Sequence, residues 1–271
     1  MAYRLGIDIG GTFTDVVSVN EDTGQIGIVK THSTPGNFAE GVLEALRLAQ
    51  ESTSVPPSSI EYIAHGTTVV TNTLLEGSGA KTALVTTRGF RDVLELRRQN
   101  RAELYNLFQD PPSILVDRHL RLEITERIGP SGEVLTPLAL DEIDDIIKFL
   151  KDHKVEAVAV CLLYSFLLPE HEQIIGKRLR SALPDTVVFL SCEVLPEIRE
   201  YERTSTTAVC AYVGPVLEKY LQNLEDSLKT AGYPSMYLMA SGGGVVSPLE
   251  ALKVPANVVE SGPAAGVTAA I

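Results

Sequence analysis

The sequence predicts an α/β protein with about two domains, and three observations support this fold class. Between residues 60 and 194, short strand patterns alternate with amphipathic helix patterns. The first 33 residues contain three consecutive strand patterns, which are typical of an antiparallel meander. The chain has 271 residues, of which 44% are hydrophobic, so it is long and apolar enough for two domains of ~100–200 residues each.

The meander opens the chain, and a hairpin turn at Glu21–Gly24 separates its second and third strands. An amphipathic helix is expected next, because its apolar residues recur at helical spacing. Strand, helix and strand then follow as in an α/β sheet. The elements expected up to residue 87 are strands at 3–10, 14–20, 25–33, 60–66 and 81–87 and helices at 35–52 and 67–77.

Residues 90–137 interrupt this order, since they are rich in Arg, Pro and Asp and alternate clearly only at His119–Ile128. We expect an inserted subdomain of loops with a small hairpin there. Beyond it the patterns predict helices at 141–154 and 169–183, strands at 155–166 and 186–194, helices within 199–232 that break near Gly214-Pro215, and strand-to-glycine turns at 236–246 and 256–267. We therefore assign a first domain to residues 1–195 and the beginning of a second, similar domain to residues 196–271.

The composition excludes several classes of protein. The formal net charge of −12 argues against nucleic-acid binding, which needs a basic face, and it would repel an anionic substrate unless Mg²⁺ or a cluster of donors were present. No apolar run approaches the ~20 residues that span a bilayer, and the N-terminus lacks a signal-peptide pattern. Three widely spaced cysteines form no metal pattern and predict reduced thiols in a cytoplasmic protein.

The stretch GIDIGGTFTDVV, residues 6–17, is the strongest candidate for a binding motif. Gly10 and Gly11 interrupt a strand pattern and allow a ligand to approach the backbone closely, which a Cβ atom would block. The turn then presents its N–H groups, together with the hydroxyls of Thr12 and Thr14, to an anion. These four residues are therefore predicted to bind a phosphate group.

A carboxylate flanks this turn on each side, Asp8 before it and Asp15 after it. Carboxylates beside a phosphate site are explained if Mg²⁺ bridges them to the phosphate, usually through water. We therefore predict Asp8 and Asp15 as metal-binding and catalytic residues. The alternative is a Gly-Gly hairpin whose hydroxyls only satisfy the turn. A Walker A loop is a different motif, because it needs Gly-Lys-Ser/Thr at the start of a helix.

Two further glycine-rich loops follow predicted strands. In VVESGPAAGV, residues 258–267, a strand is expected to end at Glu260 or Ser261, and the helix that should follow would favour phosphate at its N-terminus. In MASGGGVVS, residues 239–247, the glycines come directly after a strand. Small residues at these places also allow tight packing of strands on helices. The residues predicted to contact the nucleotide are Gly242, Gly243, Ser261, Gly262 and Gly266.

His65 ends a strand, and its ordinary pKa suits a general base or a donor to the substrate. The alternative is a histidine that begins a helix or is satisfied in a turn. Residues 88–101 contain five arginines, which suit carboxylate or phosphate recognition, although a solvated helix face or a subunit contact explains them equally well. The charged residues between 197 and 203 are more simply the start of a helix with intrahelical ion pairs.

The motif DIGGTFTD resembles the first phosphate motif of the actin, hexokinase and Hsp70 class of ATPases. In that class a loop from each of two domains clamps the phosphates of a nucleotide. The resemblance therefore implies an RNase H-like (actin-like ATPase) first domain with an inserted subdomain, followed by the beginning of a second similar domain.

Six motifs along the chain resemble, in the same order, the hydantoinase A/5-oxoprolinase family: GIDIGGTFTDVV, AHGTTVVTNTLLE, TTRGFRDVLELRRQNR, REYERTSTTAVCAYVGPVLEKYL, SGGGVV and ESGPAAGV. The resemblance implies that ATP hydrolysis, with Mg²⁺, drives the opening of cyclic amides such as hydantoins, N-methylhydantoin or 5-oxoproline. It also implies a B-type partner subunit or domain and places His65 in a family motif. Relatives include subunits of ketone carboxylases.

Two other functions remain open. A small-molecule kinase of the same superfamily also carries Asp-x-Gly-Gly-Thr, although it does not explain the HGTTVVTN and GFRDVLELRRQNR motifs. A non-catalytic nucleotide sensor is the third possibility. Chains of the family continue well beyond the second loop, so we expect this chain to be a fragment with negligible ATPase activity by itself.

Overall fold

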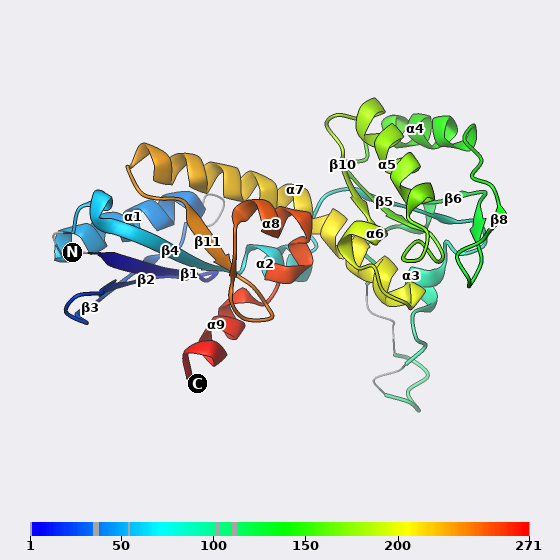
Figure 1. The fold of residues 1–271 in the computed structure, drawn as a ribbon. Coiled ribbons are helices and arrows are strands. Elements are labelled where there is room, and N and C mark those ends of the chain that lie inside the picture. The colour runs from blue at the N-terminus through cyan, green and yellow to red at the C-terminus, as the bar shows by residue number, and fades with distance from the viewer. Residues whose placement is uncertain (1, 35–37, 54, 101–102, 110–112, 271) are drawn as a thin grey trace. The chain divides into compact units, whose positions relative to one another are not determined.

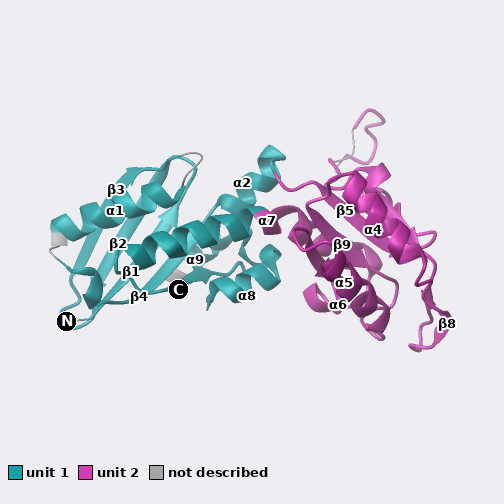
Figure 2. Cartoon of the chain, turned by 90° about the horizontal axis from the view of Figure 1, so that it is seen from above, with its two compact units in different colours: residues 1–78, 216–271 teal, residues 79–215 magenta. Residues whose placement is uncertain are grey.

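The computed structural model describes residues 2–34, 38–53, 55–100, 103–109 and 113–270, and the chain divides into two compact units (Figure 2). Unit 1 consists of residues 1–78 and 216–271, and unit 2 consists of residues 79–215. Each unit combines a sheet with helices, so the predicted α/β class is confirmed. Among the described residues, no helix has the length and apolar character needed to cross a membrane.

Unit 1 is built on a mixed six-stranded sheet. Its strands are β1 (Tyr3–Ile9), β2 (Phe13–Asn20), β3 (Ile26–His32), β4 (Ile60–Thr67), β11 (Met236–Met239) and β12 (Val245–Val246), in the order β12-β11-β4-β1-β2-β3. The predicted meander is confirmed, because β1 pairs antiparallel with β2 and β2 pairs antiparallel with β3. On the other side of β1, β4 lies parallel to it, and β11 lies parallel to β4.

Helices cover one face of this sheet more completely than the other (Figure 1). Unit 1 contains α1 (Phe38–Thr53), α2 (Val69–Glu76), α8 (Pro248–Lys253), α9 (Ser261–Ala270), the second half of α7 (Glu200–Thr230) and the 3-10 helices η1 (Pro57–Ser59) and η3 (Pro255–Val258). Phe38 of α1 packs edge to face on Tyr220 of α7, with ring centroids 6.5 Å apart. Leu5 lines a small cavity with Leu46 of α1, so the buried residues of β1 face these helices.

Unit 2 is built on a parallel four-stranded sheet. Its strands are β5 (Thr82–Thr87), β6 (Arg121–Ile124), β9 (Ala157–Cys161) and β10 (Val187–Leu190), in the order β10-β9-β5-β6. Every residue of β5 and β9 is buried, as expected for central strands of a parallel sheet. The other elements are α3 (Val93–Leu96), α4 (Glu142–Asp152), α5 (Glu170–Ala182), α6 (Ser191–Val194), the first half of α7, η2 (Arg118–Leu120) and the strands β7 (Arg127–Ile128) and β8 (Val134–Thr136).

The region predicted as an insertion, residues 90–137, is only part of unit 2. Its small hairpin is present, since β7 pairs antiparallel with β8. However, β6 also falls in this region and joins the parallel sheet beside β5. The compact insertion therefore extends from residue 79 to residue 215. The predicted domain division at residue 195 lies within unit 2 and stays a prediction.

Two local predictions are wrong. Helix α7 continues through Pro215 instead of breaking there, because Pro215 removes a single backbone hydrogen bond while buried residues on both sides keep the helix packed. Residues 256–260 form no strand: η3 ends at Val258, and α9 begins at Ser261. Pro255, at the start of η3, lacks the N–H group that a central strand would need.

Candidate functional site

A row of residues crosses the open face of the unit 1 sheet, one on each of four neighbouring strands. Asp8 on β1 is paired with Gly66 on β4 on one side and with Asp15 on β2 on the other. Asp15 is in turn paired with Lys30 on β3, and Lys30 Nζ lies 2.9 Å from both oxygens of Asp15. Directly opposed residues of a sheet share a face, so three charged side chains stand side by side.

Asp8 lies where β1, β4 and the start of α9 meet. A Cβ atom on Gly66 would lie 3.0 Å from Asp8 Oδ1, and one on Gly262 would lie 3.6 Å from it. The two glycines thus make room for the carboxylate, whose outer side faces solvent. Partial desolvation by this packing is the main cause that raises the pKa of Asp8, the negative charge of Asp15 adds to the rise, and Lys30 opposes it.

The turn between β1 and β2 is fixed by a hydrogen bond on its inner side, and its outer side is exposed to solvent. The Ser33 hydroxyl donates a hydrogen bond of 2.8 Å to the carbonyl of Gly10. Gly11 and Thr12 are exposed, and a Cβ atom on Gly11 would lie 3.8 Å from Nδ2 of Asn72 on α2. Gly11 does not adopt a positive φ, so the absence of a side chain there serves access rather than backbone conformation.

The start of α9 is tied to the end of β4 by the buried Ser261. Its hydroxyl accepts a hydrogen bond of 3.1 Å from the N–H of Thr67 and donates one of 2.9 Å to the carbonyl of the same residue. The Thr71 hydroxyl on α2 also donates to the carbonyl of Val259, just before α9. The N-terminus of α9, which favours anions, is thereby held beside Asp8.

The two carboxylates fit a magnesium ion whose remaining ligands are phosphate and water. No group of three or more His, Cys, Asp or Glu side chains that could hold a metal occurs in the described part of the chain. Mg²⁺ in nucleotide sites usually takes only one or two carboxylates, with phosphates and waters as its other ligands. Asp8 and Asp15 supply that number, and a cation between them would relieve the repulsion that contributes to the raised pKa of Asp8.

Thr14 does not join this site. Its side chain is fully buried on the inner face, where its hydroxyl and that of Ser33 are 3.0 Å apart and hydrogen-bonded. The alternation of β2 explains this, because its neighbour Asp15 faces outward. The predicted contact of the Thr14 hydroxyl with phosphate is therefore not supported by its position; Thr14 supports the turn from below.

His65 also lies on the inner face and has 0% of its surface exposed. Its Nδ1 lies 3.3 Å from the carbonyl oxygen of Ile7, and its Nε2 accepts a hydrogen bond of 2.6 Å from the hydroxyl of Tyr220. Burial lowers the pKa of His65 to about 4, which keeps the ring neutral. Because Asp8 faces the other side of the sheet, this arrangement favours a satisfied histidine over the predicted general base.

The other predicted glycines lie in the turn after β11 and within α9. Gly242 and Gly243 lie in the turn after β11, at the edge where the parallel strands β1, β4 and β11 all end. The N–H of Glu260 donates a hydrogen bond of 3.0 Å to the hydroxyl of Ser241, which links this turn to the start of α9. Gly266 is exposed one turn further along α9, and no contact brings it to Asp8.

The three loops therefore lie in one compact unit. Gly11, Gly242 and Gly262 all belong to unit 1, and the pairing of β11 with β4 is what returns the later loops to the sheet of the first. The clamp of a nucleotide between loops of two domains stays a prediction. Sequence reasoning missed Lys30, Gly66 and Asn72, because only the strand register and the position of α2 bring them to the row.

Replacing Ser261 with Ala is expected to lower the free energy of unfolding by about 1–2 kcal/mol, because the buried N–H and carbonyl of Thr67 both lose their partner. Urea unfolding of the two proteins measures the loss. The matched control is Ser227→Ala on the exposed side of α7, where the hydroxyl only bonds within its own helix and the change should stay within about 0.5 kcal/mol. Equal effects of the two substitutions would contradict the anchoring role of Ser261.

Comparison with known proteins gives two matches to family regions. Residues 4–183 match the hydantoinase/oxoprolinase N-terminal region, and residues 203–271 match the hydantoinase/oxoprolinase region. The caprolactamase subunit alpha of Pseudomonas jessenii is 36% identical over 280 residues, which cover 99% of this chain and 40% of that protein.

Two solved structures are similar over nearly the whole chain. The crystal structure of the ATP-dependent caprolactamase from Pseudomonas jessenii matches with a TM-score of 0.88 and 35% identity, over 96% of this chain and 39% of that one. The nucleotide-free structure of acetone carboxylase, from a study of ATP-dependent acetone carboxylation, matches with a TM-score of 0.89 and 26% identity, over 98% and 40%. The chain thus spans about 40% of the length of these relatives.

Proposed function

This chain belongs to the hydantoinase/oxoprolinase family, and from that membership we propose that it supplies the ATP-binding part of a hydrolase that opens cyclic amides. The observation that carries the proposal is the position of Asp8, opposite Asp15, beside the Gly10–Gly11 turn and the start of α9. The ATP-dependent caprolactamase supports it, since its name describes a lactam as substrate.

In the proposed site, Asp8 and Asp15 would hold Mg²⁺, which would neutralise the charge of the phosphates. Exposed N–H groups at Gly11 and Thr12 and the first N–H groups of α9, around Gly262, contact the phosphate oxygens. Lys30 orients Asp15 through their ion pair. Gly242, Gly243, Ser261 and Gly266 remain proposed members of the nucleotide site. Thr14 and His65 act from the inner face of the sheet.

ATP is useful in this reaction because an amide carbonyl is a poor electrophile. Transfer of the γ-phosphoryl group to the carbonyl oxygen of the ring would turn that oxygen into part of a leaving group and would couple ring opening to ATP. Such a transfer depends mainly on positioning and charge neutralisation, which a carboxylate pair, a metal ion and backbone N–H groups can provide.

The same proposal extends to the fold and the partners. We assign unit 1 to the RNase H-like (actin-like ATPase) class, and its strand order β3-β2-β1-β4-β11 with three antiparallel and two parallel members supports this. A B-type partner subunit and a cytoplasmic location are also part of the proposal. The partner is supported by the designation of the Pseudomonas relative as a subunit alpha.

The second candidate function is an ATPase subunit of a ketone carboxylase, which the structural similarity to acetone carboxylase favours. One experiment separates the two. ADP release by the full-length protein with its partner subunit is measured with caprolactam, a hydantoin, 5-oxoproline, or acetone with bicarbonate. Stimulation by a cyclic amide supports the hydrolase, and stimulation only by the ketone with bicarbonate supports the carboxylase.

Gly11→Val is expected to abolish nucleotide binding with little effect on stability. The branched side chain would project from an exposed turn toward the proposed phosphates, whereas the ordinary φ of Gly11 means that valine causes no left-handed strain. Calorimetry on the full-length protein should show at least a ~10-fold loss of ATP affinity, and the melting temperature should change little. The control is Gly6→Val on β1, where a Cβ atom meets nothing within 4 Å. Unchanged affinity in Gly11→Val would show that the turn is only a hairpin.

A further inference from the structure

Lys30 is a cation at the edge of the proposed metal and phosphate site in unit 1. It lies on β3 directly opposite Asp15 of β2, and its Nζ is 2.9 Å from both carboxylate oxygens. Asp15 lies in turn opposite Asp8 of β1. The row therefore carries two negative charges and one positive charge, and the ammonium offsets half of the charge that the carboxylate pair presents.

The charge of Lys30 also acts on Asp8, which lies one strand further away. Burial is the main cause that raises the pKa of Asp8, Asp15 adds to the rise, and Lys30 lowers the pKa again. Lys30 thus favours the ionised form of Asp8 across the intervening strand β2. The electrostatic influence of Lys30 therefore extends over the whole carboxylate pair.

An aromatic ring fixes the ammonium of Lys30 in this position. Nζ lies 4.8 Å from the centroid of the Phe13 ring, which is a cation–π contact. The ring stacks on His32, its directly opposed partner on β3, with centroids 5.0 Å apart and planes at 30°. The ammonium is therefore held between a carboxylate and an aromatic ring, both of which come from β2.

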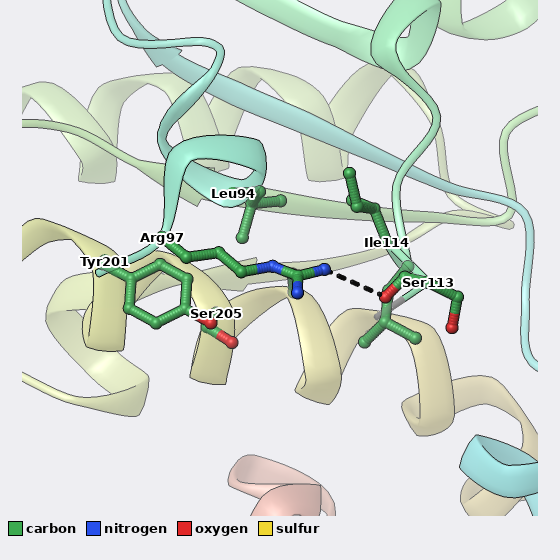
Figure 3. Close-up of a pocket in the computed structure, with 8 residues that line it drawn as sticks. Leu94, Arg97, Ser113, Ile114, Tyr201 and Ser205 are labelled. Atoms are coloured by element: carbon green, nitrogen blue, oxygen red, sulfur yellow. Dashed lines mark hydrogen bonds between the residues drawn. The ribbon is translucent and has the colours of Figure 1, made fainter. Parts of the chain in front are cut away.

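Three arginines that the sequence suggested for phosphate recognition belong instead to unit 2. Arg88 and Arg98 are paired there with glutamates. Arg97 lines a cavity of about 240 Å³ within the same unit, and one of its guanidinium nitrogens lies 3.5 Å from the carbonyl oxygen of Ser113 (Figure 3). Lys30, by contrast, belongs to the sheet that carries the carboxylate pair, so strand register fixes its position at the proposed site.

An ammonium in this position opposes a bare divalent cation and favours a phosphate. It repels the cation, and it contacts both oxygens of Asp15, so a metal ion has to compete with it for that carboxylate. It attracts the phosphates, and of its three N–H donors the two oxygens of Asp15 take two, which leaves one for a phosphate oxygen. Without Lys30 the pair would attract a bare cation more strongly and repel a nucleotide more strongly.

We propose that Lys30 determines the specificity of the carboxylate pair, so that the pair binds a divalent metal ion together with a nucleoside polyphosphate in preference to the bare ion. Phe13 is a positioning residue that holds the ammonium for this role. The inference rests on the proposed function, since it concerns the same site. It predicts that removal of the ammonium changes the affinities for the bare ion and for the nucleotide in opposite directions.

The test measures two binding equilibria of the full-length protein, and neither requires turnover. Mn²⁺, which like Mg²⁺ prefers oxygen ligands, is the probe for the bare ion, and its binding without nucleotide is followed by electron paramagnetic resonance. Binding of the non-hydrolysable imido analogue of ATP with Mg²⁺ is followed by calorimetry. Lys30→Met should strengthen Mn²⁺ binding and weaken binding of the analogue, each at least ~5-fold at low ionic strength.

Two conservative variants and a matched control accompany this test. Lys30→Arg keeps the charge and should retain both affinities within about twofold of the wild type. Phe13→Leu should shift both affinities in the directions of Lys30→Met by about 2–3-fold, whereas Phe13→Tyr keeps the ring and should match the wild type. The control is Lys253→Met, which removes an exposed lysine of α8 in the same unit and should change neither affinity.

The opposite directions of the two shifts separate specificity from structural damage, because a distorted site would bind both probes less well. The role of Lys30 is refuted if Lys30→Met gains no affinity for Mn²⁺, or if it binds the analogue as tightly as the wild type does. Failure of the proposed function gives a different result, namely a wild-type protein that does not bind the analogue at all. An analogue that binds the wild type and Lys30→Met equally leaves the proposed function intact and refutes this inference alone.

Discussion

Asp8→Asn is expected to lower ATP turnover of the full-length protein, with its partner subunit, at least ~100-fold. The carboxylate stands opposite Asp15 at the point where the first turn, the end of β4 and the start of α9 meet. Asparagine keeps the shape but removes the charge that we propose to hold Mg²⁺ on the phosphates. Loss of one preorganised electrostatic contact to a transition state typically costs ~10²–10³ in turnover. Steady-state ADP release at saturating ATP and Mg²⁺ measures the effect.

A measurement of stability shows whether the loss of turnover in Asp8→Asn is due to unfolding. Burial and Asp15 raise the pKa of Asp8 in the folded state, so at neutral pH the ionised carboxylate disfavours the fold relative to the unfolded chain. Asp8→Asn should therefore be at least as stable as the wild type at pH 7. This advantage should disappear as the pH falls below the ordinary pKa of an aspartate, because Asp8 is then protonated in both states. Because the side chain is largely exposed, the gain should be small.

The matched control is Glu61→Gln, which removes an exposed carboxylate from β4 in the same unit. It should retain wild-type turnover. Wild-type turnover in a folded Asp8→Asn protein would refute the proposed role of Asp8, and with it the assignment of the carboxylate pair to Mg²⁺. An equal loss in both variants would show that general electrostatics, rather than this site, is responsible.

His65→Leu is expected to destabilise the fold by about 1–3 kcal/mol at pH 7.5, because the buried hydroxyl of Tyr220 loses its acceptor. Leucine fills a similar volume without polar atoms. The loss is measured by urea unfolding. Tyr220→Phe removes the other partner, and the double substitution should cost less than the sum of the two single ones, since the remaining groups no longer need each other. If the losses of stability in the two single variants simply added up in the double variant, the hydrogen bond between His65 and Tyr220 would not be the source of the effect.

The same histidine predicts the acid sensitivity of the protein. Its pKa is about 4 in the folded state, against an ordinary value of about 6.5 in the unfolded chain. The unfolded chain therefore takes up a proton first as the pH falls. The contribution of His65 is fully present above pH 6.5, and up to about 3 kcal/mol is lost between pH 6.5 and pH 4. In His65→Leu this part of the pH dependence should be absent, and an unchanged profile would contradict it.

His65→Leu also tests the predicted catalytic role. A general base contributes typically ~10²–10⁴ to turnover, so its removal would nearly abolish activity. We expect turnover per folded molecule to stay within about tenfold of the wild type, because the His65 ring is buried on the inner face, whereas Asp8 lies on the outer face. A loss of ~10² or more in folded protein would restore the general-base assignment.

Local sequence patterns predict the α/β class, most helices and strands, and the first turn with its flanking carboxylates. These features depend on residues that are near one another in the sequence. Strands and helices follow from the spacing of apolar residues, and Gly10 and Gly11 lack a Cβ atom, which lets a ligand approach the backbone. The inward positions of Thr14 and His65 also followed from the alternation of their strands, since Asp15 and Gly66, their neighbours, face outward. The alternation of the strands therefore indicates that Thr14 and His65 face inward, although a hydroxyl and an imidazole are chemically suited to a binding site.

Which distant residues share the site depends on strand register and long-range packing. Lys30 reaches the row through the register of β2 on β3, and a shift of one residue would turn it to the other face. The pairing of β11 with β4 joins segments about 170 positions apart and brings Ser261 and Gly262 to Asp8, so the three loops belong to one unit. The pairing of distant strands depends on the burial of a whole face of the sheet, and every strand contributes to that burial. Local sequence patterns therefore predict the elements, and long-range packing brings three of their ends together at Asp8.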